Sequence, residues 1–313
     1  MKKPLCRFIL TSLALFAANP AAASCGAAFC TVNTDWHAQG AGRDTGARLD
    51  LRYEFVNQDR LMAGSDRIAV GQVSRHDDEI RTLNRNLVLG FSYNTSAGWG
   101  INVHIPWVSR SHHHIHHDED EKIDERWNID EPGDARVTLR LPLNDRENLG
   151  LLIGLKLPTG RSTVANAENV AERSLQPGTG STDALFGLAY HSSPHAGPHG
   201  WFAQTMWLHA TALRNSYRPG DQWGVDLGWR YAFSHDWSAT VQANWQIRAR
   251  DQGRNADPAD SGGRFLKLSP GLIYALRRDT QFYAFVQLPV YAHVNGVQLT
   301  DGKNFALGVS QRF

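Results

Sequence analysis

The residues most able to do chemistry in this chain are histidines between positions 112 and 117. They are His112, His113, His114, His116 and His117. Four carboxylates, at positions 118–121, follow them directly. Imidazole and carboxylate groups bind Zn²⁺, Cu²⁺ and Ni²⁺, so this His-rich run is a candidate metal site. A solvated loop that holds no metal is the alternative interpretation, and the residues alone do not decide between the two.

The first 23 residues predict a secretory signal. Basic residues precede a short apolar stretch over 8–18, and Ala21, Ala22 and Ala23 fit the small-residue rule for cleavage before Ser24. An uncleaved anchor helix would need a longer apolar run. Lipid attachment at Cys25 is a further alternative, although the residues before it lack the usual leucine.

Removal of this signal leaves two cysteines, Cys25 and Cys30, in an oxidising compartment. We expect them to form a local disulfide, with a metal or redox role as the alternative. The signal holds three of the 32 basic residues and none of the 31 acidic ones, so 29 basic residues remain and the net charge becomes −2. That balance gives no indication of a nucleic-acid partner.

Motifs for catalysis are poor. The sequence contains no Gly-x-Ser-x-Gly, Walker loop or His-Glu-x-x-His, so we predict that the protein is not an enzyme. A rim hydrolase built on Ser192 or Ser193 is the weakest of the alternatives, because neither serine has a supporting pattern around it.

The elements that must position these residues alternate with a period of two. In the clearest segment, the odd positions from 237 to 247 are apolar and the even positions from 238 to 248 are polar, so the two sets lie on opposite faces of a strand. Similar segments recur after residue 46. Runs of about ten such residues suit tilted strands that cross a bilayer, whereas soluble strands average five or six. We therefore predict an all-β transmembrane antiparallel barrel of about twelve strands, spanning 46–313, with both termini in the periplasm.

The twelve predicted strands are joined by short and long connections in turn, as in bacterial outer-membrane barrels. Their ranges are 46–57, 82–94, 98–109, 134–143, 149–158, 182–191, 201–212, 222–233, 237–250, 264–277, 281–293 and 304–313. The last one ends on the aromatic Phe313, which resembles the signal read by the barrel assembly machinery, a predicted partner beside the membrane lipid.

Charged residues on the polar faces must point into the lumen, because a charge at the bilayer midplane costs about 2–4 kcal/mol. The predicted lumen-lining residues are Arg52, Glu54, Arg136, Arg140, Lys156, Asp226, Arg230 and Arg248. They either line a passage for a small solute or form ion pairs that fill a narrow barrel. Residues 24–45 form a periplasmic tail or a short plug.

Two stretches resemble a known family. They run from Leu151 to Gly160, ending in Leu-Pro-Thr-Gly, and from Leu175 to Asp183, containing Gly-Thr-Gly-Ser. With the C-terminal Val-Ser-Gln-Arg-Phe, they resemble the outer-membrane family named for the meta-pathway of phenol degradation, loosely related to long-chain fatty acid transporters. The resemblance implies a channel in the Gram-negative outer membrane that passes aromatic or hydrophobic compounds. The alternative is a surface metal-binding or partner-docking protein that uses the His-rich run and needs the barrel only as an anchor.

Overall fold

The computed structural model describes residues 31–40, 45–73, 78–118, 121–167, 169–192, 197–212 and 214–313, with side chains at all of these except 116–118 and 121. The predicted signal, Cys25, Cys30 and Ser193 lie outside the described residues. No helix in the described part of the chain is long and apolar enough to cross a membrane.

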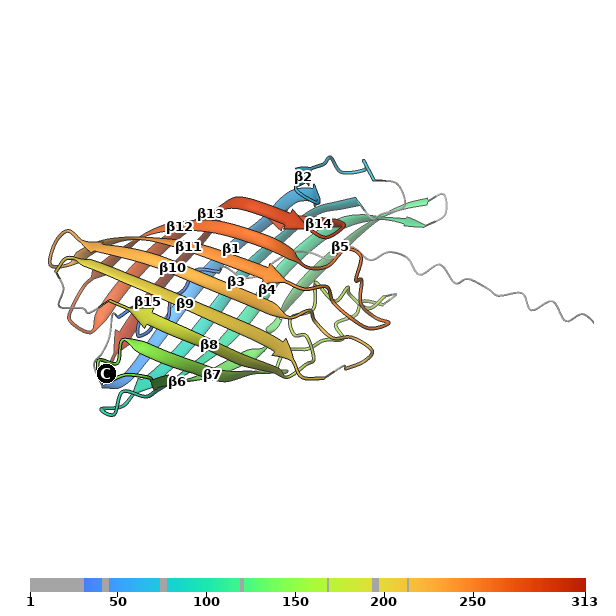
Figure 1. Ribbon diagram of the computed structural model, residues 1–313. Helices are drawn as coiled ribbons and strands as arrows, with labels where there is room; N and C mark the ends of the chain where they lie inside the picture. The colour runs from blue at the N-terminus through green and yellow to red at the C-terminus, as the bar shows by residue number, and fades with distance from the viewer. Residues whose placement is uncertain are drawn as a thin grey trace, which may run out of the picture.

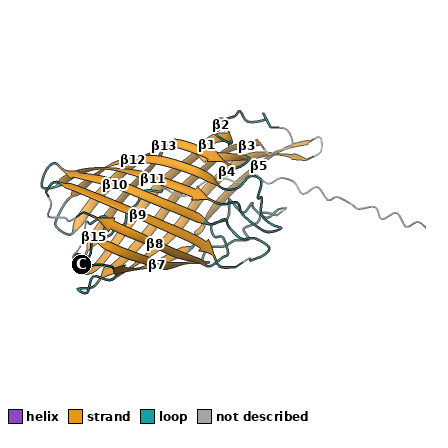
Figure 2. Ribbon diagram, in the orientation of Figure 1, coloured by secondary structure: helices purple, strands orange, loops and turns teal. Residues whose placement is uncertain are grey.

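The chain folds into antiparallel strands that close into a barrel (Figure 1, Figure 2). The strands are β1 (Gly46–Ala63), β2 (Asp66–Arg67), β3 (Asp78–Asn94), β4 (Gly100–Asp118), β5 (Glu121–Pro132), β6 (Ala135–Pro142), β7 (Leu149–Leu157), β8 (Asp183–His191), β9 (His199–Ala210), β10 (Gln222–Ala232), β11 (Trp237–Arg248), β12 (Gly263–Ala275), β13 (Thr280–Val294), β14 (Val297–Asp301) and β15 (Asn304–Arg312). Twelve strands form the wall, which confirms the predicted fold class.

Two long wall strands, β4 and β1, each pair with two successive strands along one edge. On β4, residues 107–118 pair with β5, whereas residues 100–104 pair with β6. Along β1, residues 58–63 pair with β14 and residues 48–55 pair with β15. The barrel closes where β1, the first wall strand, pairs with β15, the last one; on its other edge β1 pairs with β3, from Gly46 opposite Asn94. The second edge of β5 has no strand partner among the described residues, and the β7–β8 loop packs against this strand.

The alternation seen in the sequence separates the two surfaces of the wall. On β3, Leu87, Leu89 and Phe91 are 40–45% exposed on the outside, while Asn84 and Asn86 are fully buried inside. The strands are apolar outward because they face lipid, and polar inward because the lumen offers hydrogen-bonding partners.

Both ends of the wall-forming chain lie at one end of the barrel, where Arg48 pairs with Arg312 (Figure 1). The short turns, such as 95–99 and 276–279, are at this end, and the longer loops are at the other. In an outer-membrane barrel the short-turn end is periplasmic and the loop end is external. These ends are called periplasmic and outer below.

The predicted strands at 98–109 and 134–143 leave residues 110–133 as one of the long connections, and this prediction is wrong. Strand β4 continues to Asp118, and β5 returns beside it in register as far as Asp118 opposite Glu121. The His-rich run therefore belongs to a strand and not to a loop. The sequence pattern did not predict this part of the strand, because the alternation of lipid-facing apolar residues ends at Trp107. Beyond Trp107, both faces of β4 are mainly polar. Likewise, the predicted loop over 294–303 contains β14.

Candidate channel lumen

Residues 31–40, here called the plug, lie inside the barrel. Asn33 contacts two wall strands: its backbone N–H donates to Gln242 Oε1 (2.9 Å), and its side-chain amide donates to Asp226 Oδ2 (3.2 Å). On other sides of the wall, Gln287 donates to Thr31 Oγ1 (2.8 Å) and Asn102 donates to Asp35 Oδ2 (3.2 Å). Since β4, β10, β11 and β13 all supply these partners, the plug occupies the lumen.

The aromatic anchor of the plug is Trp36, which is only 3% exposed. Its ring packs edge-on against Tyr283 with centroids 4.9 Å apart, and its indole N–H donates to Asp50 Oδ2 (3.3 Å). The Tyr283 hydroxyl donates to the other oxygen of the same carboxylate (2.7 Å). Val32 and Phe285 belong to the same apolar cluster. The plug is thus seated by one buried aromatic contact and a set of amide and carboxylate hydrogen bonds.

A small cleft of about 20 Å³ lies between the plug and the wall. Its lining includes Asp35 and His37 of the plug, Arg48 and Asp50 of β1, and His104 of β4. These are polar and charged side chains, so a solute that passes here meets hydrogen-bonding groups rather than an apolar surface.

The residues predicted to line the lumen fall into three groups in the structure. The first group lies at the plug or toward the periplasmic end of the barrel. Arg52 pairs with Glu54 (2.8 Å) and also donates to Thr34 Oγ1 of the plug. Asp226 binds the plug directly. Arg140 is buried near the periplasmic end, where it donates to the carbonyls of Gly98 (3.3 Å) and Glu147 (2.6 Å).

The second group of predicted residues lies at the outer end of the barrel. The third group consists of residues whose side chains remain partly exposed in the lumen. Lys156 and Arg248 bind carboxylates near the outer loops. Arg136 and Arg230 share the inward parity of Lys156 and Asp226 and keep part of their surface exposed. The sequence allowed two interpretations, ion pairs that fill the barrel or residues that line a passage. Arg52, Lys156 and Arg248 form ion pairs, whereas Arg136 and Arg230 lie on the open part of the lumen.

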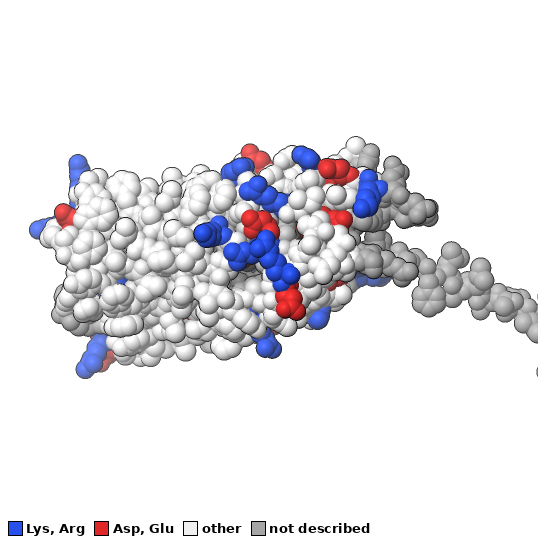
Figure 3. Space-filling model, turned by 90° about the horizontal axis from the view of Figure 1, so that it is seen from above, with Lys and Arg blue, Asp and Glu red and all other residues white. Residues whose placement is uncertain are grey.

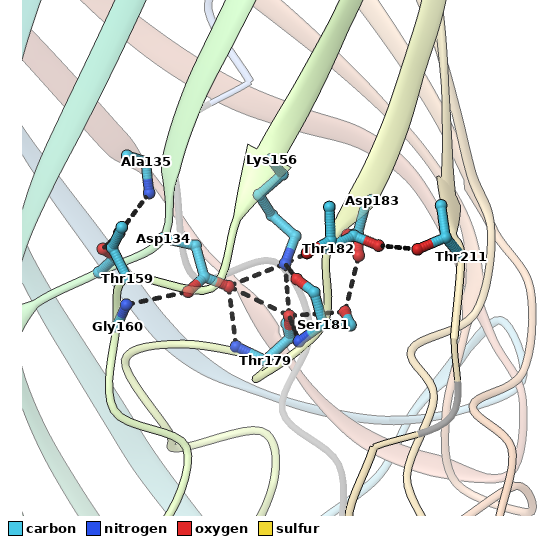
Figure 4. A network of polar contacts seen from close by, with 11 residues as sticks. Asp134, Ala135, Lys156, Thr159, Gly160, Thr179, Ser181, Thr182, Asp183 and Thr211 are labelled. Atoms are coloured by element: carbon cyan, nitrogen blue, oxygen red, sulfur yellow. Dashed lines mark hydrogen bonds and ion pairs between the residues drawn. The ribbon is translucent and has the colours of Figure 1, made fainter.

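A buried polar network holds the β7–β8 loop, residues 158–182, at the outer end (Figure 4). Lys156 is at its centre and contacts Asp134 Oδ2 (2.8 Å), Asp183 Oδ2 (3.3 Å) and the carbonyl of Ser181 (2.8 Å). Asp134 also accepts from the backbone N–H groups of Gly160 (3.1 Å) and Thr179 (2.9 Å). One lysine and one aspartate therefore tie both ends of the loop to the wall.

Sequence reasoning missed most of this network. Asp134, Thr179 and Asp183 are far apart along the chain, and each looks like an ordinary loop or strand-end residue. The one signal present was the glycine-rich spacing that carries the family resemblance, because it includes Gly160, Thr179 and Ser181. Only the closure of β6, β7 and β8 side by side brings these residues together.

The β7–β8 loop also closes the outer half of the lumen with apolar side chains. They pack on inward-facing residues of β1, β5 and β14. This outer apolar cluster consists of Leu61, Trp127, Ile129, Val164, Ala171, Leu175, Val297 and Leu299, none more than 9% exposed. Arg110 of β4 donates to the carbonyl of Ser174 (2.9 Å), which fixes the loop inward. The lumen is thus filled by apolar packing at its outer end and by polar contacts where the plug lies.

A neighbouring loop is fixed by Asp251. It accepts from the Tyr217 hydroxyl (3.1 Å) and pairs with Arg248 (2.9 Å). Burial, with the Asp251 charge beside it, raises the pKa of Tyr217 above its ordinary value. Arg173 of the β7–β8 loop lies over the Tyr217 ring, 4.9 Å from its centroid. The outer loops therefore support one another.

The described histidines of the His-rich run are divided between the two faces of β4. His112 and His114 point inward, with Nε2 of the first 2.8 Å from Nδ1 of the second, and Glu125 lies 3.1 Å from His114. His113 points outward and contacts Asp124 (2.9 Å). Among the described residues, no group of three or more His, Cys, Asp or Glu is arranged to hold a metal. The side chains of His116 and His117 are not described, so metal binding by the full run stays a prediction.

A closed antiparallel barrel, apolar toward lipid and polar within, defines an outer-membrane β-barrel protein. A family model described as "Putative MetA-pathway of phenol degradation" matches residues 135–299. That is 165 of 313 residues, more than half, so the chain belongs to this family. This confirms the resemblance inferred from the sequence. No curated protein matched the chain.

Solved structures share the fold. The "COG4313 outer membrane channel" of Pseudomonas putida F1 has a TM-score of 0.65 at 15% identity, covering 90% of this chain and 99% of that one. The toluene transporter TodX of Pseudomonas putida follows with a TM-score of 0.48 at 12% identity, covering 93% and 96%, too low to carry an argument. The first is named as a channel and the second as a transporter. The protein is an outer-membrane barrel of Gram-negative bacteria.

Proposed function

We propose that the protein is a passive outer-membrane channel for small apolar solutes, including aromatic compounds. The observation that carries this proposal is the outer apolar cluster. Trp127 and Ile129 face inward on β5 and meet Val164 and Leu175 of the inward-folded loop. When the β7–β8 loop moves and uncovers these packed side chains, they provide contacts that an apolar solute prefers to water, at roughly 25 cal/mol for each Å² it buries.

Membership of the phenol-degradation family supports the same solute class, because phenol is a small aromatic molecule. The barrel from Pseudomonas putida F1 that shares this fold is an outer-membrane channel, which supports the channel activity. Below the apolar cluster, the plug occupies the lumen through hydrogen bonds, with Trp36 as its one aromatic anchor. A solute that reaches the periplasm therefore passes a segment that must move aside.

The test is uptake of radiolabelled phenol by cells that lack the native barrel and express a variant. We expect Trp127→Ala to lower uptake several-fold, since it removes the largest side chain of the outer apolar cluster. The matched control is Trp107→Ala, because Trp107 lies on β4, the strand that pairs with β5, but faces outward and is 47% exposed. Equal amounts of heat-modifiable, folded barrel must be present in both strains.

Two results would contradict the proposal. One is phenol uptake that does not depend on the barrel. The other is liposome swelling in which a small sugar enters as fast as it does through a general porin. In that case the lumen conducts polar solutes, and the apolar cluster is only a structural core.

A further inference from the structure

The outward face of the wall carries a small basic patch at its outer end. Arg81 and Arg85 lie on β3, and Lys303 lies between β14 and β15, on the other side of β1. All three side chains are exposed. We call these residues the outer cationic patch. Figure 3 shows that charged side chains gather toward the loop end of this face, beside a stretch of wall with almost none.

The patch begins where the lipid-facing surface ends. On β3 the outward positions are Phe91, Leu89 and Leu87, each at least 40% exposed, and the next outward position is Arg85. Arg85 is in register with Phe55 of β1, whose ring stacks on Phe305 with centroids 4.8 Å apart. Aromatic rings mark the interface of a barrel with the head groups. The cations therefore lie at head-group level on the outer side.

The three cations share one area of the wall. Gln58 is in register with Thr82, which places Arg81 beside Asp59, and Arg81 donates to Asn57 Oδ1 (2.7 Å). The Gly302 N–H donates to the Asn57 carbonyl (2.8 Å), so Lys303 lies next to Asn57 on the opposite side of β1. Neighbouring strands are about 4.8 Å apart, so Lys303 is about two strand spacings from the arginines of β3, a gap that extended Lys and Arg side chains bridge from both sides.

The cations of the patch are not neutralised as those in the lumen are. Inside the barrel, Lys156 and Lys267 each contact a buried carboxylate at 2.8 Å or less. By contrast, neither Arg85 nor Lys303 forms a side-chain hydrogen bond or an ion pair with the part of the chain that the structure describes. Asp59 lies beside Arg81, and Asn57 donates to the Asp59 carboxylate (2.6 Å). The patch keeps a net positive charge directed at the membrane.

We propose that the outer cationic patch binds the phosphate groups of lipid A, the phosphorylated glycolipid of the outer leaflet. Guanidinium and ammonium groups form charge-assisted hydrogen bonds with phosphate, and Arg matches phosphate geometry in particular. Phe55 and Phe305 lie beside Arg85 and on the membrane side of Arg81 and Lys303, where the acyl chains of the same lipid pack. A cation above an aromatic pair therefore matches both parts of one amphipathic molecule.

The experiment measures binding of lipid A to the purified full-length barrel in a zwitterionic detergent by native mass spectrometry. The test variant is Arg85→Gln with Lys303→Gln, which removes two charges and keeps the side chains long and polar. We expect its apparent Kd for lipid A to rise about tenfold. Arg85→Lys with Lys303→Arg keeps both charges and should retain binding to within about threefold of the native affinity.

The matched control is Arg277→Gln with Arg278→Gln. These arginines are exposed on the β12–β13 turn at the periplasmic end, and their replacement should leave lipid A binding unchanged. The proposal fails if the test variant binds lipid A as the native protein does, or if the control variant loses as much affinity. It fails also if inorganic phosphate at millimolar concentration displaces lipid A completely, because the site then recognises free phosphate. Dephosphorylated lipid A should bind at least about tenfold more weakly than the phosphorylated form.

Discussion

Asn33 of the plug and Gln242 of strand β11 form a reciprocal pair of hydrogen bonds. The Asn33 N–H donates to Gln242 Oε1, and Gln242 Nε2 donates to the Asn33 carbonyl, each at 2.9 Å. The Gln242 side-chain amide thus satisfies the backbone N–H and carbonyl of Asn33, as a neighbouring strand would do. Because water can replace each of these bonds, their net contribution is about 1 kcal/mol apiece.

Replacement of Gln242 by Ala should free the plug. With two hydrogen bonds lost, at about 1 kcal/mol each, the displaced state should become roughly thirtyfold more populated. Single-channel recordings in planar bilayers would show this as a higher open probability. Gln246→Ala is the control, since Gln246 lies on the same strand and bonds to Gln222 rather than to the plug. Identical traces for both variants and the native barrel would show that the plug does not gate conductance.

Lys156→Met should destabilise the outer half of the barrel. It leaves Asp134 and Asp183, which are 8% and 7% exposed, as two buried carboxylates without their shared cation. Loss of one partner of a buried pair costs about 3–5 kcal/mol. Urea-dependent unfolding in micelles would measure the loss, with the exposed Lys122→Met as the reference. A change below about 1 kcal/mol would show that the network is solvated.

Gly178→Ala should loosen the β7–β8 loop. An added Cβ would overlap the carbonyl oxygen of Gly160 and the carboxylate of Asp134, both of which belong to the network around Lys156. Overpacking of this kind costs about 1–3 kcal/mol. Limited proteolysis should then cut the loop faster than in the native protein. Gly224→Ala serves as the control, because a Cβ there meets nothing closer than 3.9 Å.

Phe313 is expected to matter for assembly rather than for the finished barrel. It is 72% exposed and follows the last strand, with its N–H donating to the Ala47 carbonyl (2.8 Å). Phe313→Ala should therefore lower the amount of folded barrel in the outer membrane several-fold while leaving its unfolding free energy nearly unchanged. Leu276→Ala, at a 50% exposed apolar position on a periplasmic turn, should have no such effect. Equal folded amounts of all three proteins would contradict the assembly role.

Metal capture by the His-rich run requires sub-micromolar affinity for zinc or copper. The test is calorimetric titration of the purified barrel without any affinity tag, then of a variant with asparagine at all five histidines. A control with His209→Asn and His293→Asn removes imidazoles elsewhere. Affinity no better than that of a histidine tag, or unchanged in the variant with five asparagines, would contradict capture.

The strands were predictable wherever one face meets lipid. Leu87, Leu89 and Phe91 alternate with polar residues, and each of the twelve predicted ranges overlaps a wall strand. The prediction failed above Trp107, because strands that leave the membrane have water on their outer face. Ser109, Ser111 and His113 carry no apolar signal there, although β5 pairs with them.

The parts of the candidate site were less accessible to sequence reasoning. The alternation of residues along each strand predicted that Arg52 and Lys156 point inward. It did not predict which residues they contact. The pairing of Lys156 with Asp134 depends on which strands become neighbours and on where the loop returns. The sequence left the N-terminal segment as either a tail or a plug, because hydrogen bonds such as those between Asn33 and Gln242 join residues more than two hundred positions apart.

Nearly every strand of this wall pairs with the strand that precedes it in the chain, apart from the seam at β1. There, Arg48 is opposite Arg312 and Phe55 is opposite Phe305. Hairpins close small loops at low entropic cost, whereas this seam joins the two ends of the wall. The seam therefore forms late during folding, after the intervening hairpins. Until it does, β1 and β15 present open edges, and the chain is most vulnerable to aggregation just before the barrel closes.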